Sequence, residues 1–188
     1  IAGSPFQSAI APRSVDPGAS TVEFSYSEVG AETTVTITVK DTEGDNYIYG
    51  ENFPITVEIN VTGANTATVA AQDADENGEY DGVYTASYTP ANYGDDIIAI
   101  TVNDQPVGDS PYTITTAPRP ADPSQSYATW ESASEFFEAQ VNALTSITIT
   151  ILNEAGEPYD YGDIRPVTVA FSVSGANTVA TTPLDDPE

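Results

Sequence analysis

The residues best suited to chemistry in this chain are oxygen-bearing side chains grouped in one loop. They stand at relative positions 1, 3, 5 and 9 of the loop, with a glycine at position 6, and they are Asp73, Asp75, Asn77, Asp81 and Gly78. Calcium takes about six to eight oxygen ligands around a tight turn, and calcium-binding loops use this spacing. Position 12, where such a loop supplies a bidentate glutamate, is Tyr84. The spacing predicts a candidate calcium site, and the alternative is a metal-free hairpin turn at the Asn-Gly pair.

Two other groups of acids are predicted to form a solvated rim. Their members are Asp41, Glu43, Asp45 and Glu51 in one loop, and Glu154, Glu157, Asp160 and Asp163 in a second loop of similar sequence. Charged side chains without a buried partner stay in water. Paired carboxylates can hydrolyse glycosides, but nothing around these acids forms the cleft that the reaction needs. We therefore predict no catalytic residues.

The composition excludes whole classes of function. The 188 residues include no histidine and no cysteine, so the chain lacks His-based triads, thiol nucleophiles and ordinary zinc sites. Four basic residues against 29 acidic ones give a formal net charge of −25, which repels nucleic acid and anionic membrane surfaces. We predict a protein that is not an enzyme, has no cofactor except possible calcium, binds no nucleic acid and does not insert into a membrane.

Two polar residues are candidates for covalent modification. Asn60 begins the sequon Asn60-Val61-Thr62 and lies between inward-facing neighbours on its strand, so a glycan there would not disturb a core. The alternative is a chance sequon. Lys40, the sole lysine, lies on a polar strand face and is predicted to be an ordinary solvated lysine rather than part of an isopeptide crosslink.

Alternation of apolar and polar residues predicts that β-strands carry these side chains. Val35, Ile37 and Val39 alternate with polar residues, as half-buried strands require. The predicted strands are Thr21–Tyr26, Val35–Lys40, Ile55–Thr62, Thr66–Ala71, Val83–Thr89, Asp96–Asn103 and Pro111–Ala117. This many short strands within about 100 residues, separated by turn signals, predict an antiparallel sandwich.

An internal repeat organises the chain. Elements of 4–17 recur within 110–123, and the segment 35–50 recurs as 147–162. The offset changes from 106 to 112 around Ser132–Leu144, where the pattern fits a short helix and a bulged strand equally. The large aromatic residues near this change are predicted to pack in a core or between repeats, and they are Trp130, Phe136 and Phe137.

Several motifs together carry a family resemblance. They are Asn77-Gly78-Glu79-Tyr80, the run Tyr84–Pro90, Gly94, Ile98, Ile100, Val102, and the segments Gly3–Phe6 and Gly108–Tyr112. This pattern resembles the filamin-type immunoglobulin-like repeat of actin-crosslinking rods. Bacterial surface immunoglobulin-like repeats share much of its Asn-Gly turn pattern. The resemblance implies a tandem rod of immunoglobulin-like β-sandwiches.

With the repeats in register, the chain divides into three parts. Residues 1–13 are predicted to be a closing strand belonging to a preceding repeat, 14–118 a complete repeat, and 119–188 a partial repeat that lacks its last strands. The partial repeat would leave an apolar face uncovered, formed by Ile147, Ile149, Ile151, Val167, Val169, Phe171 and Val173. Burying each such side chain is worth about 1.5–3 kcal/mol. Either the sequence is a stretch of a longer tandem array, or successive copies complete one another head to tail.

The sequence thus predicts an all-β fold of tandem immunoglobulin-like antiparallel β-sandwiches, the second incomplete. The predicted function is a non-catalytic structural subunit of an extracellular filament or surface rod. Its expected partners are copies of itself or adjacent repeats, and its expected location is extracellular or at the cell surface. The alternatives are a filamin-like cytoplasmic actin-crosslinking rod, a calcium-dependent cell-surface adhesin and a salt-adapted accessory module of an enzyme.

Overall fold

The computed structural model describes residues 11–73, 80–131, 146–162, 164–173 and 179–181. The chain forms two compact units, Ile1–Pro118 and Arg119–Glu188. The segment predicted as a helix or bulged strand lies outside the described residues, together with Phe136 and Phe137. No helix among the described residues is long and apolar enough to cross a membrane.

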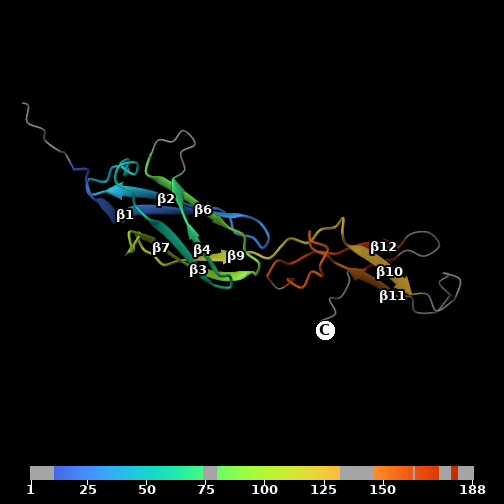
Figure 1. Cartoon of the computed structure of the whole chain (residues 1–188). Helices are drawn as coiled ribbons and strands as arrows, with labels where there is room; N and C mark the ends of the chain where they lie inside the picture. Colours follow the sequence, from blue (N-terminus) through green and yellow to red (C-terminus); the bar gives the residue numbers. More distant parts are fainter. Residues whose placement is uncertain (1–10, 74–79, 132–145, 163, 174–178, 182–188) are drawn as a thin grey trace, which may run out of the picture. The chain divides into compact units, whose positions relative to one another are not determined.

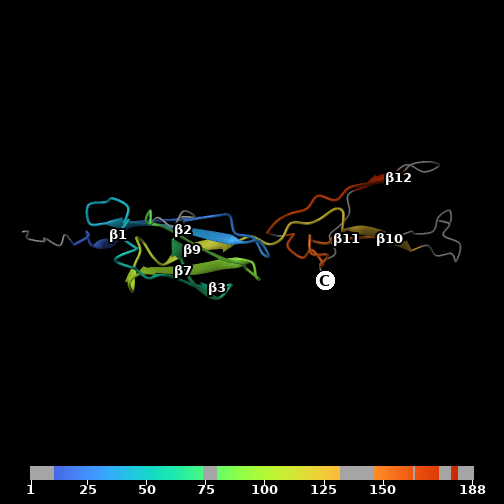
Figure 2. The ribbon, with the colours of Figure 1, turned by 45° about the horizontal axis from the view of Figure 1, so that its top comes forward.

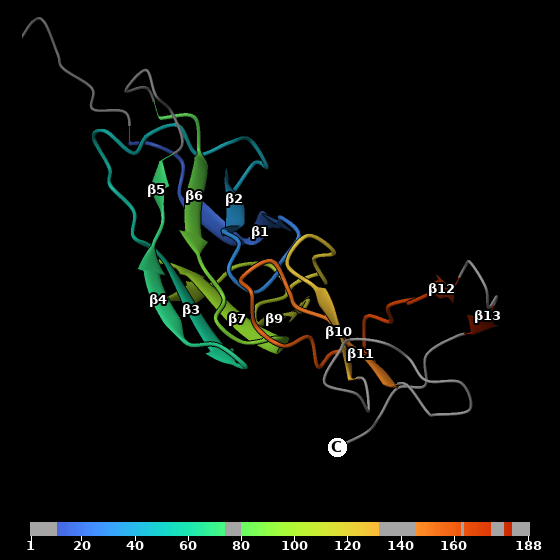
Figure 3. The same cartoon turned by 90° about the vertical axis from the view of Figure 1, so that its right-hand side faces the viewer.

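The first unit is a sandwich of two antiparallel sheets (Figure 1). One sheet has the order β1 (Val15–Phe24), β2 (Thr33–Asp41), β6 (Val83–Tyr88), β5 (Gln72–Asp73). The other has the order β4 (Ala67–Ala70), β3 (Val57–Gly63), β7 (Gly94–Val102), β8 (Gln105–Pro106), and β9 (Tyr112–Thr116) also pairs with β7. Figures 2 and 3 show the two layers, with β1 and β2 in one and β3 and β7 in the other.

Each strand predicted for this unit is confirmed, with ends shifted by at most two residues, except that β1 begins six residues before the predicted start at Thr21. Along β2 the side chains alternate between fully and partly buried, as the apolar–polar alternation predicts. The sequence did not predict β5 and β8, because two residues are too few for an alternating pattern. Both are short strands at the margins of their sheets.

The core of the first unit lies between the sheets. Apolar residues of β2, β3 and β7 that are at most 1% exposed make up its centre, and they are Val35, Ile37, Val39, Ile59, Val61, Ile98, Ile100 and Val102. At about 1.5–3 kcal/mol for each buried side chain, this cluster is the main source of the unit's stability.

The second unit repeats the first half of this fold. Its described strands form two pairs, β10 (Tyr127–Glu131) with β11 (Ser146–Thr150), and β12 (Phe171–Val173) with β13 (Val179–Thr181). Trp130 faces Ile147 in the first pair, as Phe24 faces Val35 in β1 and β2. The described residues of this unit contain no strands equivalent to β6, β7 or β9. The predicted fold class, all-β with immunoglobulin-like antiparallel sheets, is therefore confirmed.

Candidate functional site and interaction surfaces

The turn after β2 is built around one buried carboxylate. Asp41 Oδ1 accepts hydrogen bonds from the backbone N–H groups of Glu43 (2.9 Å) and Asp45 (3.1 Å). Gly44 completes the turn with a φ of 87°, a conformation that glycine adopts without strain. The Asp41 side chain is 1% exposed, so the prediction of a solvated acid was wrong for this residue. The sequence around Asp41 resembles a surface turn, and the N–H groups that donate to its carboxylate are positioned only once the turn has folded.

Arg13 ties the start of the repeat to this turn. Its guanidinium lies 3.2 Å from Asp41 Oδ2, 2.9 Å from Glu43 Oε2 and 2.6 Å from Asp45 Oδ2. These partners, chiefly the hydrogen bond to Asp45, raise the pKa of Arg13 above its ordinary value. Burial acts to raise the pKa of Asp41, but the amide donors and Arg13 outweigh it and lower that pKa. Three acids of the predicted rim therefore hold one arginine.

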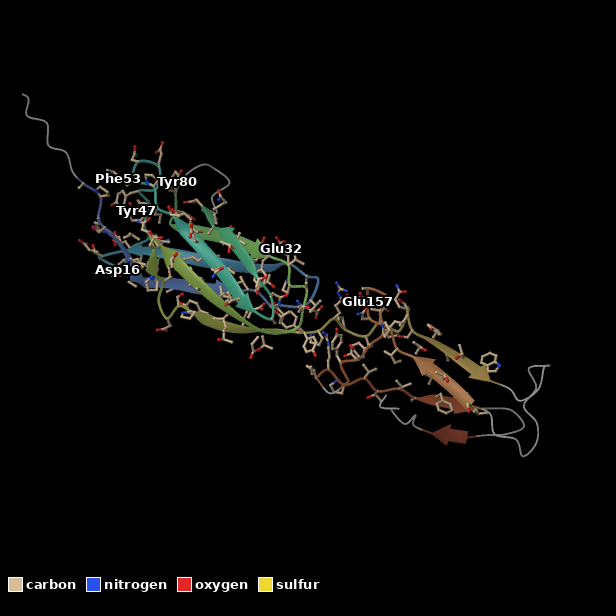
Figure 4. The ribbon with its side chains drawn as sticks, turned by 60° about the horizontal axis from the view of Figure 1, so that its bottom comes forward. Asp16, Glu32, Tyr47, Phe53, Tyr80 and Glu157 are labelled. Carbon is tan, nitrogen blue, oxygen red and sulfur yellow. The ribbon has the colours of Figure 1, made fainter. Side chains whose placement is uncertain are left out.

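The second unit contains the same arrangement 112 residues later. Asn153, 2% exposed, takes the place of Asp41 and accepts hydrogen bonds from the N–H groups of Ala155 (2.9 Å) and Glu157 (3.0 Å). Arg119 lies 3.1 Å from Glu157 Oε2, and Figure 4 labels Glu157. Asn153 was not among the residues predicted from the sequence, although the repeat offset places it at the position of Asp41.

The other acids of the second loop fit the predicted rim where they are described. Glu154, Glu157 and Asp160 are exposed, and Asp163 lies outside the described residues. Glu51, the remaining acid of the first loop, is also exposed.

A second pair of hydrogen bonds fixes the entry of each unit. Ser20 Oγ donates to the Asp16 carbonyl (2.8 Å) and accepts from the N–H of Lys40 (3.0 Å). In the second unit Ser126 makes the equivalent bonds with Asp122 (2.8 Å) and Leu152 (3.0 Å). The hydroxyl and amide of Ser124 lower the pKa of Asp122 by donating to its carboxylate. The chain therefore enters both units by the same anchored path.

The exit of the first unit is anchored as well. Ala117 donates its N–H to the Ser27 carbonyl (2.9 Å), and its own carbonyl accepts from the N–H of Val29 (2.9 Å). Pro118 is the one residue between this anchor and Arg119, which is held in the second unit by Glu157. The connection between the two units is therefore very short.

The second unit leaves apolar side chains exposed that the first unit buries. Ile147 is 42% exposed, whereas its equivalent Val35 is 1% exposed. Val173 is 36% exposed, whereas its equivalent Val61 is 1% exposed. In the first unit β2 lies between β1 and β6, but among the described residues β11 pairs only with β10. Among the described residues, the second unit therefore leaves uncovered the apolar positions that the first unit buries.

Comparison with known proteins identifies the repeat. The model of the filamin/ABP280 repeat matches residues 14–113. The chain belongs to the filamin repeat family. The Lin-41 filamin domain aligns at 19% identity with a TM-score of 0.42, covering 54% of this chain and 94% of that domain.

Two bacterial surface proteins also align with the chain. The Escherichia coli adhesin FdeC aligns at 19% identity with a TM-score of 0.54, covering 87% of this chain and 48% of the adhesin. Invasin, a bacterial integrin-binding protein, aligns at 18% identity with a TM-score of 0.49, covering 80% of this chain and 29% of invasin. The chain thus spans about half or less of these proteins. The likeness to FdeC supports the immunoglobulin-like fold.

The candidate calcium loop of the filamin repeat is only partly described. Asp73 lies half-buried in β5, and Asp81 Oδ1 accepts a hydrogen bond from the N–H of Val83 (2.8 Å). Asp75 and Asn77 lie outside the described residues. Among the described residues, no group of three or more acidic side chains is arranged so that it could hold a metal ion. Calcium therefore stays a prediction.

The two candidate modification residues lie on the surface or near it. Asn60 is exposed on β3, and its Oδ1 accepts a hydrogen bond from Thr68 Oγ1 (3.1 Å). Glycosylation at Asn60 stays a prediction. Lys40 is partly buried, and its Nζ donates to Asn46 Oδ1 (2.7 Å). Lys40 is therefore partly buried and hydrogen-bonded, whereas the sequence predicted a solvated lysine.

A buried polar network near the exit of the filamin repeat was not predicted from the sequence. Asp96 is 0% exposed and accepts hydrogen bonds from the N–H of Asn65 (2.8 Å), Tyr88 Oη (2.9 Å) and Thr116 Oγ1 (3.1 Å). Burial, followed by this contact with Asp96, raises the pKa of Tyr88 to about 12. The network joins a strand of one sheet to strands and a turn of the other. It therefore holds the exit end of the sandwich together.

Proposed function

We propose that this chain is a non-catalytic structural segment of a rod built from filamin-type repeats. The observation that carries the proposal is the second unit, which repeats the first half of the first unit, and whose described residues leave Ile147 and Val173 exposed. A surface of this kind is stable only when further strands cover it, because each buried aliphatic side chain contributes about 1.5–3 kcal/mol. Open strand edges also favour the addition of strands.

The strands that cover the open face are proposed to be equivalents of β6, β7 and β9. In the first unit β6 pairs with β2, while β7 pairs with β3 and β9. Such strands belong either to a longer polypeptide that carries this one or to another copy of the chain. Both sources make adjacent repeats the partners of the second unit.

The short connection favours a rod over a chain of domains joined by flexible linkers. Ala117 is held by the first unit and Arg119 by the second, and the residue between them is a proline. Proline fixes its own φ near −65°, and short proline-containing links restrict the angles that neighbouring domains adopt. We propose that the mechanical role of the protein depends on this restricted hinge.

The rod is proposed to lie outside the cell or on its surface. The formal net charge of −25 and the structural likeness to the adhesin FdeC support this location. Membership of the filamin repeat family favours the second candidate, a cytoplasmic rod that crosslinks actin. Fractionation of the cells that make the protein distinguishes the two.

The structural proposal is tested by completing the second unit. Glu188 is equivalent to Glu76, so residues 77–118 of this chain are appended after it. We expect calorimetry of the extended chain to show a cooperative unfolding transition for the second unit. The control carries Ile98→Asp and Ile100→Asp in the appended copy, which removes its apolar face. No gain in cooperativity over this control would contradict the proposal.

A further inference from the structure

We propose that a groove at the entry end of the first unit is the docking site for the exit end of a preceding filamin-type repeat. This inference rests on the proposed rod and names the surface through which successive repeats meet. The groove is open to solvent and has a volume of about 470 Å³, and its lining includes Pro12, Arg13, Tyr47, Phe53, Pro54 and Asn103. Figure 4 shows Tyr47 and Phe53 at the same end of the unit as Asp16, with Glu32 away from them.

The groove combines apolar side chains, such as Phe53 and Pro54, with polar ones, such as Arg13 and Asn103. Phe53 is 48% exposed, yet its N–H donates to the Tyr49 carbonyl (2.9 Å) and its carbonyl accepts from Tyr47 Oη (3.1 Å). The rings of Tyr47 and Tyr49 pack edge to face at 5.6 Å. An exposed aromatic residue on a braced backbone loses little entropy on binding, as a docking residue should.

Chain connectivity identifies the occupant. Residues 4–11 match 110–117 in sequence, and 110–117 contain the closing strand of the first unit and its exit. A repeat that uses 4–11 in the same way ends at Ala11, one residue before the lining residue Pro12 and two before Arg13. Its exit end must therefore lie within a few residues of the groove.

The exit end of the first unit shows which side chains such a repeat brings. Tyr26 is 70% exposed and Tyr93 is 45% exposed. Tyr26 adjoins Ser27, which accepts a hydrogen bond from Ala117, and Tyr93 lies in the turn whose Pro90 carbonyl accepts from the N–H of Gly30 (2.8 Å). Exposed tyrosines suit a groove with a mixed apolar and polar lining, because their rings pack while their hydroxyls reach water or amides.

The second unit keeps part of this surface, although Arg165 stands in the place of Phe53. Pro118, Tyr159, Pro166 and Val167 stand where the first unit has Pro12, Tyr47, Pro54 and Ile55. Tyr159 packs edge to face on Tyr161 at 5.7 Å and donates to the Arg165 carbonyl, as Tyr47 does to the carbonyl of Phe53. A small anionic ligand is disfavoured as the occupant, since three carboxylates already surround Arg13.

Disulfide trapping tests the docking directly, because the chain has no cysteine of its own. Residues 14–106 are fused ahead of Ile1, so that 1–11 can close a complete preceding repeat. One cysteine replaces Tyr26 in the added repeat, and the second is Phe53→Cys in the original one. The control pairs the same Tyr26 position with Ile97→Cys, because Ile97 is 45% exposed and lies on β7 away from the groove.

We expect the pair with Phe53→Cys to oxidise at least about tenfold faster than the control, since both pairs share one tether and docking holds the Tyr26 position beside Phe53. Equal rates would overturn the groove as a docking site. X-ray scattering of the cysteine-free fusion reports on the rod separately. If the particles are extended and narrowly distributed in size while the oxidation rates are equal, the rod proposal stands and the groove is not the docking site. A broad distribution of sizes would contradict the rod proposal itself.

Discussion

Asn153 Oδ1 accepts hydrogen bonds from two backbone N–H groups of its turn, at 2.9 and 3.0 Å, and Asp41 Oδ1 accepts the equivalent two, at 2.9 and 3.1 Å. The turn geometry therefore does not require a charge. The charge of Asp41 instead forms the ion pair with Arg13, which contacts the other carboxylate oxygen, Oδ2. These two functions of one side chain can be separated by mutation.

Asp41→Asn is expected to keep the turn and to lose the ion pair with Arg13. The pKa of Asp41 is lowered in the folded protein, so the stability it contributes is present above the unfolded pKa of about 3.9 and is lost as the pH falls through the folded value. Urea unfolding from pH 7 to pH 2 measures the difference between wild type and variant. That difference should shrink below about pH 4. A constant difference, or one matched by the exposed control Glu51→Gln, would contradict this role.

Asp96→Ala is expected to destabilise the first unit by at least about 2 kcal/mol, because buried donors of Asn65, Tyr88 and Thr116 lose their acceptor. The neighbouring acid provides a matched control. Asp95 is exposed and accepts a hydrogen bond from Thr115 Oγ1, so Asp95→Ala should change stability by no more than about 0.5 kcal/mol. Chemical denaturation measures both variants, and equal effects would show that the buried network contributes little.

The difference between Asp95 and Asp96 shows where sequence reasoning stopped. Alternation located the strands correctly, since Val35, Ile37 and Val39 all face the core. The same rule assigns charged residues to solvent, and it fails for Asp96 because its partners come from distant segments. Asn65 lies 31 residues away from it and Thr116 lies 20 residues away. The repeat offset places Asn153 at the position of Asp41, but the buried role of both residues depends on the N–H groups of the folded turn.

Calcium at fixed ionic strength is expected to raise the Tm of the first unit, because an ion that binds the folded loop stabilises it by mass action, by about 2.7 kcal/mol at one hundred times its Kd. The variants Asp73→Ala and Asp75→Ala should lose the response. Calorimetry across a calcium titration with compensating sodium chloride measures it. A flat response in the wild type would remove the predicted site.

Sodium chloride is expected to favour association of the chain even without calcium. A formal net charge of −25 makes neighbouring repeats repel one another. The Debye length falls from about 30 Å at 0.01 M salt to about 8 Å at physiological ionic strength, so the repulsion shortens in range. Analytical ultracentrifugation at the two salt concentrations measures the effect. Indifference to salt would argue that charge does not control assembly.

The most direct test of the incomplete second unit is hydrogen exchange of the unmodified chain at low concentration. Amides of β2, β3 and β7 should be strongly protected, because they lie in complete sheets over a buried core. Amides of β11 should exchange much faster, because its described neighbour is β10 alone and Ile147 is exposed. Equal and strong protection of β2 and β11 in a dilute monomer would contradict the account.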